Sequence, residues 1–321
     1  MKKVSVIVPV YNAENTLTDC LGNLVHQTLE DIELILVNDA STDGSLEILL
    51  SCERQFPDKV LLINNTENLG AGGARNLALD MAQGEYVGFV DADDMVDSHM
   101  YEKLYTAAKA GDYDIVDCAY LDIKKDKAIC LTAEDMTGVL DDEKRSKLIT
   151  AQGYLCTKLI RRRLFEEPVK LRERERVILE DMDVLTYLYA IAHSVTHVLE
   201  ILYKYNDRPD SSSKIKQPVR YVENILAAME AVYDKTHALP GYEGIREAVE
   251  YAILSLYLNG AVMVLQTRDE YPPAQADHLL RRLAAMRKKT VRAKRCEDNP
   301  YVSKRFSKQE LMCVREADKM M

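Results

Sequence analysis

Three carboxylates within four residues form the strongest chemical signal in the sequence. Asp91, Asp93 and Asp94 directly follow an apolar run. Carboxylates this close repel one another, and their burial is costly unless a cation offsets the charge. Oxygen ligands of this kind favour Mg²⁺ or Mn²⁺, and Mg²⁺ typically joins one or two carboxylates to substrate phosphates. The segment predicts a divalent-metal site that neutralises a diphosphate; the alternative is a solvated acidic turn that caps the next helix.

Asp39 is a second candidate, because it closes the apolar run 32–37. At the end of a buried strand its carboxylate would accept a hydrogen bond from a base, such as the N3–H of uracil. The segment 9–14 follows the first apolar run and has two interpretations. Asn12 or Glu14 starts the next helix, or the segment's backbone edge holds a base.

A glycine-rich segment, 68–76, follows the third apolar run. Glycines before a helix allow close backbone approach, which suits phosphate or sugar groups. The alternative is a tight turn whose small residues pack a helix on a sheet. A dinucleotide fingerprint follows the first strand instead, so the position of this segment disfavours a dinucleotide-dependent oxidoreductase.

Glu180 and Asp181 begin an amphipathic helical pattern. Acidic residues in the first turn of a helix often serve only its dipole. This pair alone therefore leaves both a structural and a catalytic role open.

Alternating strand and helix patterns must position these side chains. Apolar runs predict strands, and the segments between them have helical spacing. The predicted strands are 4–8, 32–37, 60–63, 86–90, 114–119 and 198–205, and the predicted helices are 17–25, 46–50, 74–82 and 179–192, with a nearly all-helical pattern from residue 218. The sequence thus predicts an α/β fold with a mostly parallel, Rossmann-like sheet covered on both faces, which binds ligands beyond the carboxyl ends of its strands.

Composition narrows the function classes. The chain has 321 residues, more than one core usually fills, and a net charge of -10, which disfavours nucleic acid as a partner. Seven cysteines without a C-x-x-C pair predict reduced thiols in a cytoplasmic protein. The run 4–8 is too short for a signal peptide and meets a proline, and the apolar stretch 252–265 predicts a buried helix rather than a membrane span.

Taken together, the segments resemble glycosyltransferase family 2, which has the GT-A fold. The resemblance is carried by the residues 6–14, 37–45, 68–70 with 74–76, and 91–94, and continues more weakly through Lys158, Glu180-Asp181 and the segment from Tyr203 to Ser212. It implies an inverting transfer of a sugar from a nucleotide-diphosphate sugar, usually a UDP-sugar, to a saccharide or lipid-linked saccharide acceptor. It also implies Mn²⁺ or Mg²⁺ on the diphosphate.

The resemblance assigns roles to individual residues. Asp93 and Asp94 would hold the metal, and Asp181 would be the general base that takes a proton from the acceptor hydroxyl. The implied nucleotide-binding residues are Pro9, Val10, Tyr11, Glu14, Asp39, Asn68, Gly70, Arg75 and Asp91. The implied loop over the diphosphate contains Arg208, Ser211 and Ser212. The chain departs from the family at Cys156, where many relatives carry a tryptophan, and this weakens any inference about the acceptor.

The sequence predicts a catalytic domain over 1–215 and a helical region over 216–321 that contributes to the acceptor side. The basic stretch 281–295 is either a solvated helix face or a peripheral contact with anionic lipid headgroups at the inner face of the membrane. The helical pattern over 243–265 either packs on the core or forms a homodimer seam.

Two other function classes compete. Nucleotidyl transfer on a similar sheet requires a glycine- and arginine-rich loop after the first strand, and the segment 9–14 has neither residue type. A non-catalytic nucleotide-sugar-binding protein would retain the same acidic residues, so a turnover assay is needed to separate it from an enzyme.

Overall fold

The computed structural model describes residues 2–206, 217–270 and 272–318. The chain forms two compact units. The first contains 1–140, 153–177 and 191–209, and the second contains 141–152, 178–190 and 210–321. The boundary predicted near residue 215 lies outside the described residues. The second unit also includes two earlier segments, since helix α5 (Asp142–Ala151) contacts helix α8 (Tyr242–Gln266).

The first unit is built on one sheet. Within the described residues its strand order is β3-β2-β1-β4-β9-β6-β10-β5, with β7 beside β6 and β8 beside β10. The strands are β1 (Val4–Val10), β2 (Ile32–Asp39), β3 (Val60–Asn65), β4 (Tyr86–Phe89), β5 (Met95–Val96), β6 (Ile115–Asp122), β7 (Lys127–Ile129), β8 (Gly138–Val139), β9 (Lys158–Arg161) and β10 (Ser194–Tyr205). The four strands from β3 to β4 are parallel, as are β6 and β10, whereas β9 runs antiparallel to both of its neighbours. The predicted α/β fold with a mostly parallel sheet is confirmed.

Helices cover both faces of this sheet, because its strands are apolar on both sides. The helices of this unit are α1 (Leu17–Val25), α2 (Ser45–Gln55), α3 (Gly70–Met81) and α4 (Met100–Ala110). Val6 and Val8 of β1 join one core cluster with residues of α1, α2 and α4. Ile7 between them is equally buried and, by strand alternation, faces the other side, where α3 contacts β1 and β2.

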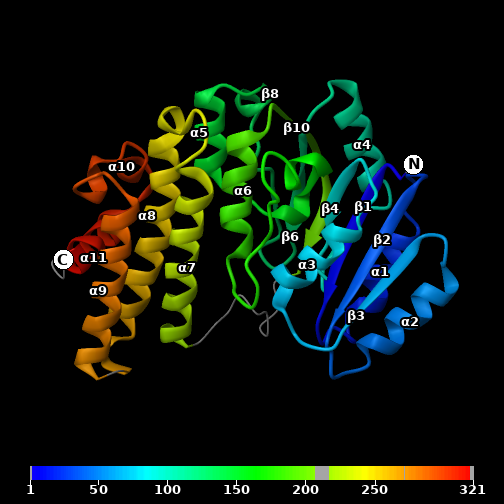
Figure 1. The fold of residues 1–321 in the computed structure, drawn as a ribbon, viewed down its shortest axis with the longest axis horizontal. Helices are drawn as coiled ribbons and strands as arrows, with labels where there is room; N and C mark the ends of the chain where they lie inside the picture. Colours follow the sequence, from blue (N-terminus) through cyan, green and yellow to red (C-terminus); the bar gives the residue numbers. More distant parts are fainter. Residues whose placement is uncertain (1, 207–216, 271, 319–321) are drawn as a thin grey trace. The chain divides into compact units, whose positions relative to one another are not determined.

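The parallel strands β1, β2 and β4 are neighbours in the order β2-β1-β4 (Figure 1). Their carboxyl ends therefore meet at one edge of the sheet. Tyr11, Asp39 and Asp91 lie at or just beyond these three ends. The fold thus brings together side chains that are up to 80 positions apart in the sequence, as expected for a parallel sheet.

The second unit is helical in its described residues. Its helices are α5, nearly all of α6 (Glu180–Ile191), α7 (Pro218–Thr236), α8, α9 (Pro273–Thr290), α10 (Val302–Arg305) and α11 (Lys308–Asp318). Helices α7, α8 and α9 contact one another, and α8 also contacts α5 and α11 (Figure 1). Helix α8 is long and apolar enough to cross a bilayer, but 72% of its most apolar window is buried. A helix that is apolar all round is typical of a core, so the prediction of a buried helix over 252–265 is confirmed.

Candidate functional site

Asp91 is held in place by a buried arginine. Its Oδ1 lies 2.8 Å from the guanidinium of Arg75, which also lies 3.0 Å from Glu173. The side chains of Arg75 and Glu173 are almost fully buried, whereas that of Asp91 is 39% exposed. Arg75 therefore fixes the orientation of Asp91 and leaves part of its carboxylate open. The predicted contact of Arg75 with a nucleotide stays a prediction, because its guanidinium is buried against Asp91 and Glu173.

Asp94 lies in a different environment, although it is only three residues away. It is 1% exposed, and it accepts hydrogen bonds from the Tyr203 hydroxyl (2.5 Å) and the Asn206 N–H (2.8 Å). Burial, followed by the neighbouring charge of Asp91, raises the pKa of the Asp94 carboxyl to about 8. Both oxygens of Asp94 accept hydrogen bonds from protein donors, and the side chain is enclosed, so it is less accessible to a cation than a half-buried acid. Asp93, which is half-buried, is the better candidate of the two predicted ligands.

The donor set after β4 fits a cation that is shared with substrate. Among the residues that the structure describes, no group of three His, Cys, Asp or Glu side chains is arranged to hold a metal ion. Mg²⁺ usually retains several waters and takes one or two carboxylates plus phosphate oxygens, so it does not need such a group. Asp93, with the open oxygen of Asp91, meets this requirement.

Asp39 ends β2 as predicted, and its carboxylate already organises the neighbouring loop. It is 2% exposed, and it accepts hydrogen bonds from the backbone N–H groups of Leu69 (2.9 Å) and Gly70 (2.8 Å) and from the Asn65 amide (3.1 Å). These bonds satisfy N–H groups at the start of α3. The predicted contact with a base stays a prediction, because the same carboxylate first serves this loop.

The glycine-rich segment packs against protein rather than facing open space. Gly70 has a φ of +75°, and a Cβ built on Gly72 would lie 2.2 Å from the carbonyl oxygen of Arg174. Asn68 donates from its amide to the carbonyl oxygen of Asp39 (3.2 Å). The packing alternative therefore accounts for these glycines, and no phosphate is needed to explain them.

The loop after β1 is tied to the loop after β2. Glu14 accepts a hydrogen bond from the Gly44 N–H (2.7 Å), and Asn12 accepts one from the Thr42 N–H (2.8 Å). The expectation that Asn12 or Glu14 starts the next helix is wrong, since α1 follows Thr16, whose side chain makes no capping bond. The two side chains fix the neighbouring loop instead.

Tyr11 offers the open surface at this edge. Its side chain is 52% exposed, while Val10 before it is buried and Pro9 is partly buried. Asn12 and Ala40, which flank this edge, both have positive φ values, of 50° and 58°. Residues other than glycine held in this region store strain, and such residues cluster at functional sites.

The remaining predicted residues belong to other parts of the chain. Asp181 is half-buried in the first turn of α6, in the second unit. Asp183, two residues further along the same helix, is fully buried and forms an ion pair with Lys235 of α7. Arg208, Ser211 and Ser212 lie outside the described residues.

Sequence reasoning included Tyr203 and Asn206 in a matching segment but gave neither a role, whereas the structure shows both bonded to Asp94. In the sequence Tyr203 is one more apolar residue of a predicted strand. Asn206 follows that strand, and its spacing from other polar residues matches no motif. Their separation from Asp94 by 109 and 112 positions leaves no local signal.

Known proteins share this sequence pattern and fold. The sequence model of glycosyl transferase family 2 matches residues 5–167. An uncharacterized glycosyltransferase, EpsJ of Bacillus subtilis (strain 168), is 34% identical over 222 residues, which are 66% of this chain and 63% of that protein. The chain thus spans less than two thirds of this curated relative.

Two solved structures have a similar fold. The structure of S. aureus TarS 1-349 in complex with UDP has a TM-score of 0.71 at 18% identity, covering 99% of this chain and 90% of that one. The mannosyltransferase PcManGT from Pyrobaculum calidifontis, in complex with GDP-Man and Mn²⁺, has a TM-score of 0.59 at 18% identity, covering 99% and 87%. At this identity both similarities establish the fold alone.

Proposed function

The chain belongs to glycosyltransferase family 2, and we propose that it transfers a sugar from a nucleotide-diphosphate sugar to a saccharide or lipid-linked saccharide acceptor. The observation that carries this proposal is the edge of the sheet where the open face of Tyr11 and the partly exposed Asp91 and Asp93 follow neighbouring parallel strands. Such an edge is where an open α/β sheet binds its ligand.

A UDP-sugar is the proposed donor. Tyr11 offers an aromatic face on which a base can stack, and Asp39 is the candidate partner for a base N–H. Asp91 is oriented by Arg75 toward the ribose or diphosphate end of the donor. The TarS structure that shares this fold was solved with UDP, and PcManGT was solved with GDP-Man and Mn²⁺. These titles support the class of donor and the use of a divalent ion.

The proposed chemistry inverts the anomeric carbon. Asp181 removes the proton of the acceptor hydroxyl, whose oxygen attacks the anomeric carbon as the bond to the diphosphate breaks on the opposite face. Asp93 would hold the cation, with Asp91 beside it, and the bound cation would supply neutralisation of the charge that develops on the leaving diphosphate. Arg208, Ser211 and Ser212 are proposed to cover that diphosphate.

The free cysteines and the burial of helix α8 bear on where the reaction takes place. The seven cysteines are free thiols, which supports a cytoplasmic protein. Helix α8 is buried within its own chain, so it supports the core alternative over a homodimer seam. A lipid-linked acceptor would require a membrane contact, for which the stretch 281–295 is the candidate. Several of its cations are already paired with acids, which weakens that contact.

Calorimetric titration tests the donor site. UDP, GDP and CDP are titrated with and without Mn²⁺ into wild type, Asp93→Ala and the control Asp58→Ala, which removes an exposed acid of the same unit. We expect one nucleotide to bind only with Mn²⁺, and this binding to be lost in Asp93→Ala alone. If no nucleotide binds in a metal-dependent way, the proposed donor site is wrong.

A turnover assay separates the enzyme from a non-catalytic binder. Release of the nucleoside diphosphate is followed with the donor that binds, in the presence of candidate saccharide acceptors. Metal-dependent binding without release under any acceptor condition, including release to water, would favour the binder.

A further inference from the structure

Tyr154 is an exposed aromatic residue of the first unit, outside the residues assigned to the donor and to the general base. It is 48% exposed. It directly precedes the short 3₁₀ helix η2 (Leu155–Thr157), which leads into β9. A single exposed aromatic side chain is not unusual, so its position and its support decide whether it can bind a ligand.

The sheet sets the position of Tyr154. Strand β9 runs antiparallel to β4 and β6, so β9 begins at the edge where β4 and β6 end. This is the edge that carries Asp91, just beyond the end of β4. Helix η2, which follows Tyr154, contacts β4, β6 and β10. Tyr154 therefore lies at the edge where an open α/β sheet binds its ligand.

Cys156 connects this segment to the strand-end acids. Burial, followed by the nearby charges of Asp91 and Asp94, raises the pKa of the Cys156 thiol. Because a charge acts on a buried group at short range, Cys156 lies beside both acids, in agreement with the contact between η2 and β4. Tyr154 is two residues before Cys156, and thus next to the proposed donor site.

A buried ion pair holds the backbone of Tyr154. The ammonium of Lys158 is fully buried and lies 3.0 Å from Oδ1 of Asp117. It also donates to the carbonyl oxygen of Tyr154 (3.0 Å). The Thr157 hydroxyl donates to the same Asp117 oxygen (2.6 Å). Charges buried in this way need such partners, and here one of the partners is the peptide group that carries Tyr154.

A second aromatic ring holds the side chain of Tyr154. Tyr120, in β6, is 7% exposed, and the centroids of the two rings are 5.6 Å apart at an interplanar angle of 86°. An edge-to-face contact covers at most one face of a ring, so at least one face of Tyr154 is not covered by Tyr120. A ring that is already held loses little conformational entropy when a ligand packs on it.

The strand order indicates which part of the reaction this ring would meet. Tyr11 and Asp39, the proposed base contacts, follow β1 and β2 on one side of β4. Tyr154 and Tyr120 belong to the start of β9 and the end of β6, on the other side of β4. The transferred sugar has to lie beside the diphosphate, at Asp91. A sugar ring further along the edge, away from the base, therefore belongs to the acceptor.

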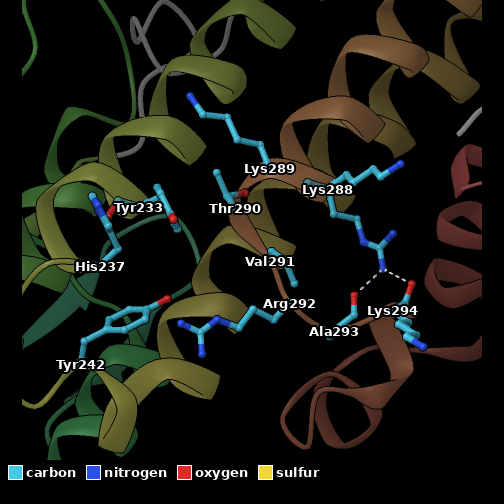
Figure 2. A pocket seen from close by; sticks show the side chains of 11 residues that line it. Tyr233, His237, Tyr242, Lys288, Lys289, Thr290, Val291, Arg292, Ala293 and Lys294 are labelled. Carbon is cyan, nitrogen blue, oxygen red and sulfur yellow. Dashed lines mark hydrogen bonds between the residues drawn. The ribbon is translucent and has the colours of Figure 1, made fainter.

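The helical unit contains a different aromatic pair. Tyr233 and His237 are stacked, with ring centroids 4.4 Å apart, at the wall of a cavity that five basic residues also line. Figure 2 shows the side chains of Lys288 and Lys294 pointing away from this pair. These cations and the stacked rings therefore do not form one binding surface.

We propose that Tyr154 binds the saccharide acceptor, with a pyranose ring of the acceptor packed on the exposed face of its own ring. The C–H groups of a pyranose form an apolar face that suits an aromatic side chain, while its hydroxyls stay in water or bind polar groups at the rim. Lys158 and Tyr120 are positioning residues that act through Tyr154. This role rests on the proposed transfer reaction, and it adds an acceptor contact to the general base Asp181.

Tryptophan fluorescence tests the contact on the full chain. The chain contains no tryptophan, so the emission of Tyr154→Trp reports on this position alone. The probes are cellobiose, lactose and N,N′-diacetylchitobiose, each titrated with and without UDP and Mn²⁺. D-Glucitol, a polyol without a ring, is the control probe. Leu199→Trp, which replaces an exposed side chain of β10, is the control variant.

We expect at least one disaccharide to shift the emission of Tyr154→Trp in a saturable way, with no response to glucitol and none from Leu199→Trp. Calorimetry with that disaccharide should show binding about three- to tenfold weaker in Tyr154→Ala than in wild type. Tyr154→Phe keeps the ring and should bind within about twofold of wild type. Nucleotide binding with Mn²⁺ should be unchanged in Tyr154→Ala.

The saccharide contact is ruled out if no disaccharide shifts the emission of Tyr154→Trp, or if Leu199→Trp or glucitol gives the same response. Equal disaccharide affinity of wild type and Tyr154→Ala would show that the ring contributes nothing. Loss of nucleotide binding in Tyr154→Ala would assign the residue to the donor instead. The titrations without UDP do not depend on the donor site, so failure of the proposed function and failure of this contact are distinguishable.

Discussion

Two acidic segments look alike in the sequence and differ in the folded chain. Residues 91–94 follow a strand, residues 180–183 begin a helix, and each contains three acids in four positions. In each segment the last acid is buried. Asp94 is bonded to a hydroxyl and an N–H, whereas Asp183 is paired with the cation of Lys235.

The difference lies in what stabilises the buried acid. Burial, followed by the nearby charge of Asp91, raises the pKa of Asp94. Its partners are neutral donors, so this acid stabilises the strand-end turn as a hydrogen-bonding group. A cation holds Asp183, so this acid joins α6 to α7 as a charge. In both segments the earlier acids remain partly exposed, and the proposed roles of Asp93 and Asp181 use two of them. Burial and partner, rather than spacing, separate structural acids from catalytic candidates.

The largest effect should come from Asp181→Asn. If Asp181 is the general base, turnover falls about 10²- to 10⁴-fold while donor binding is unchanged. The assay is nucleoside-diphosphate release together with calorimetric binding. Asp234→Asn, an exposed acid of α7 in the same unit, is the control and should keep wild-type turnover. Full turnover in Asp181→Asn would place the base elsewhere.

A stability measurement should set Asp183 apart from Asp181. Asp183→Ala leaves Lys235 without its buried partner, and we expect a loss of about 3 kcal/mol in the free energy of unfolding. The value lies at the low end for a broken buried pair, because the Lys235 side chain is 22% exposed and reaches water in part. Urea unfolding measures it. The double variant Asp183→Leu/Lys235→Met should recover most of the loss, and a double variant as unstable as the single one contradicts the ion-pair argument.

Tyr203→Phe tests the buried acid of the other segment. It removes the hydroxyl donor to Asp94 and leaves a buried carboxyl oxygen unsatisfied, so we expect a loss of about 1–3 kcal/mol in urea unfolding. Tyr11→Phe removes an exposed hydroxyl and should be neutral for stability. Equal stability of the two variants would show that the bond to Asp94 contributes nothing.

The smallest effect on stability should come from Asp91→Asn. Arg75 keeps its buried partner Glu173, and the lost pair is 39% exposed on the Asp91 side, so the free energy of unfolding should fall by less than about 1 kcal/mol. Donor affinity should nevertheless fall, because Asp91 is a proposed nucleotide contact. A loss of stability as large as that of Asp183→Ala would make Asp91 a structural acid too.

The regular part of the fold was predictable, because its strands are local apolar runs. The runs that became β1, β2, β3 and β4 are mostly apolar and bounded by turns, so the pattern needs no distant information. Strand β9 was missed, since it is four residues long with a lysine at its start. Lys158 is nevertheless fully buried, because it pairs with Asp117 at 3.0 Å across 41 positions of sequence.

The juxtaposition of the strand-end side chains was predictable, whereas their burial and hydrogen-bond partners were not. Strand ends place Tyr11, Asp39 and Asp91 at one edge, because parallel strands share their carboxyl side. The orientation and hydrogen bonding of each acid depend on partners far away in the chain. Arg75 contacts Glu173 across 98 positions, and Tyr203 contacts Asp94 across 109. Contacts between residues this far apart cannot be inferred from residue spacing in one sequence.

The interleaved second unit has a consequence for how such chains can be recombined. The helical unit contains three separate stretches of chain, which begin at 141, 178 and 210. Strand β10 of the sheet lies between the second and the third of them. A fragment that ends near 215 would keep α5 but remove α8, against which α5 packs, and expose an apolar surface. The helical unit is therefore not one continuous segment, and an exchange of this unit between relatives would have to replace several separate stretches together.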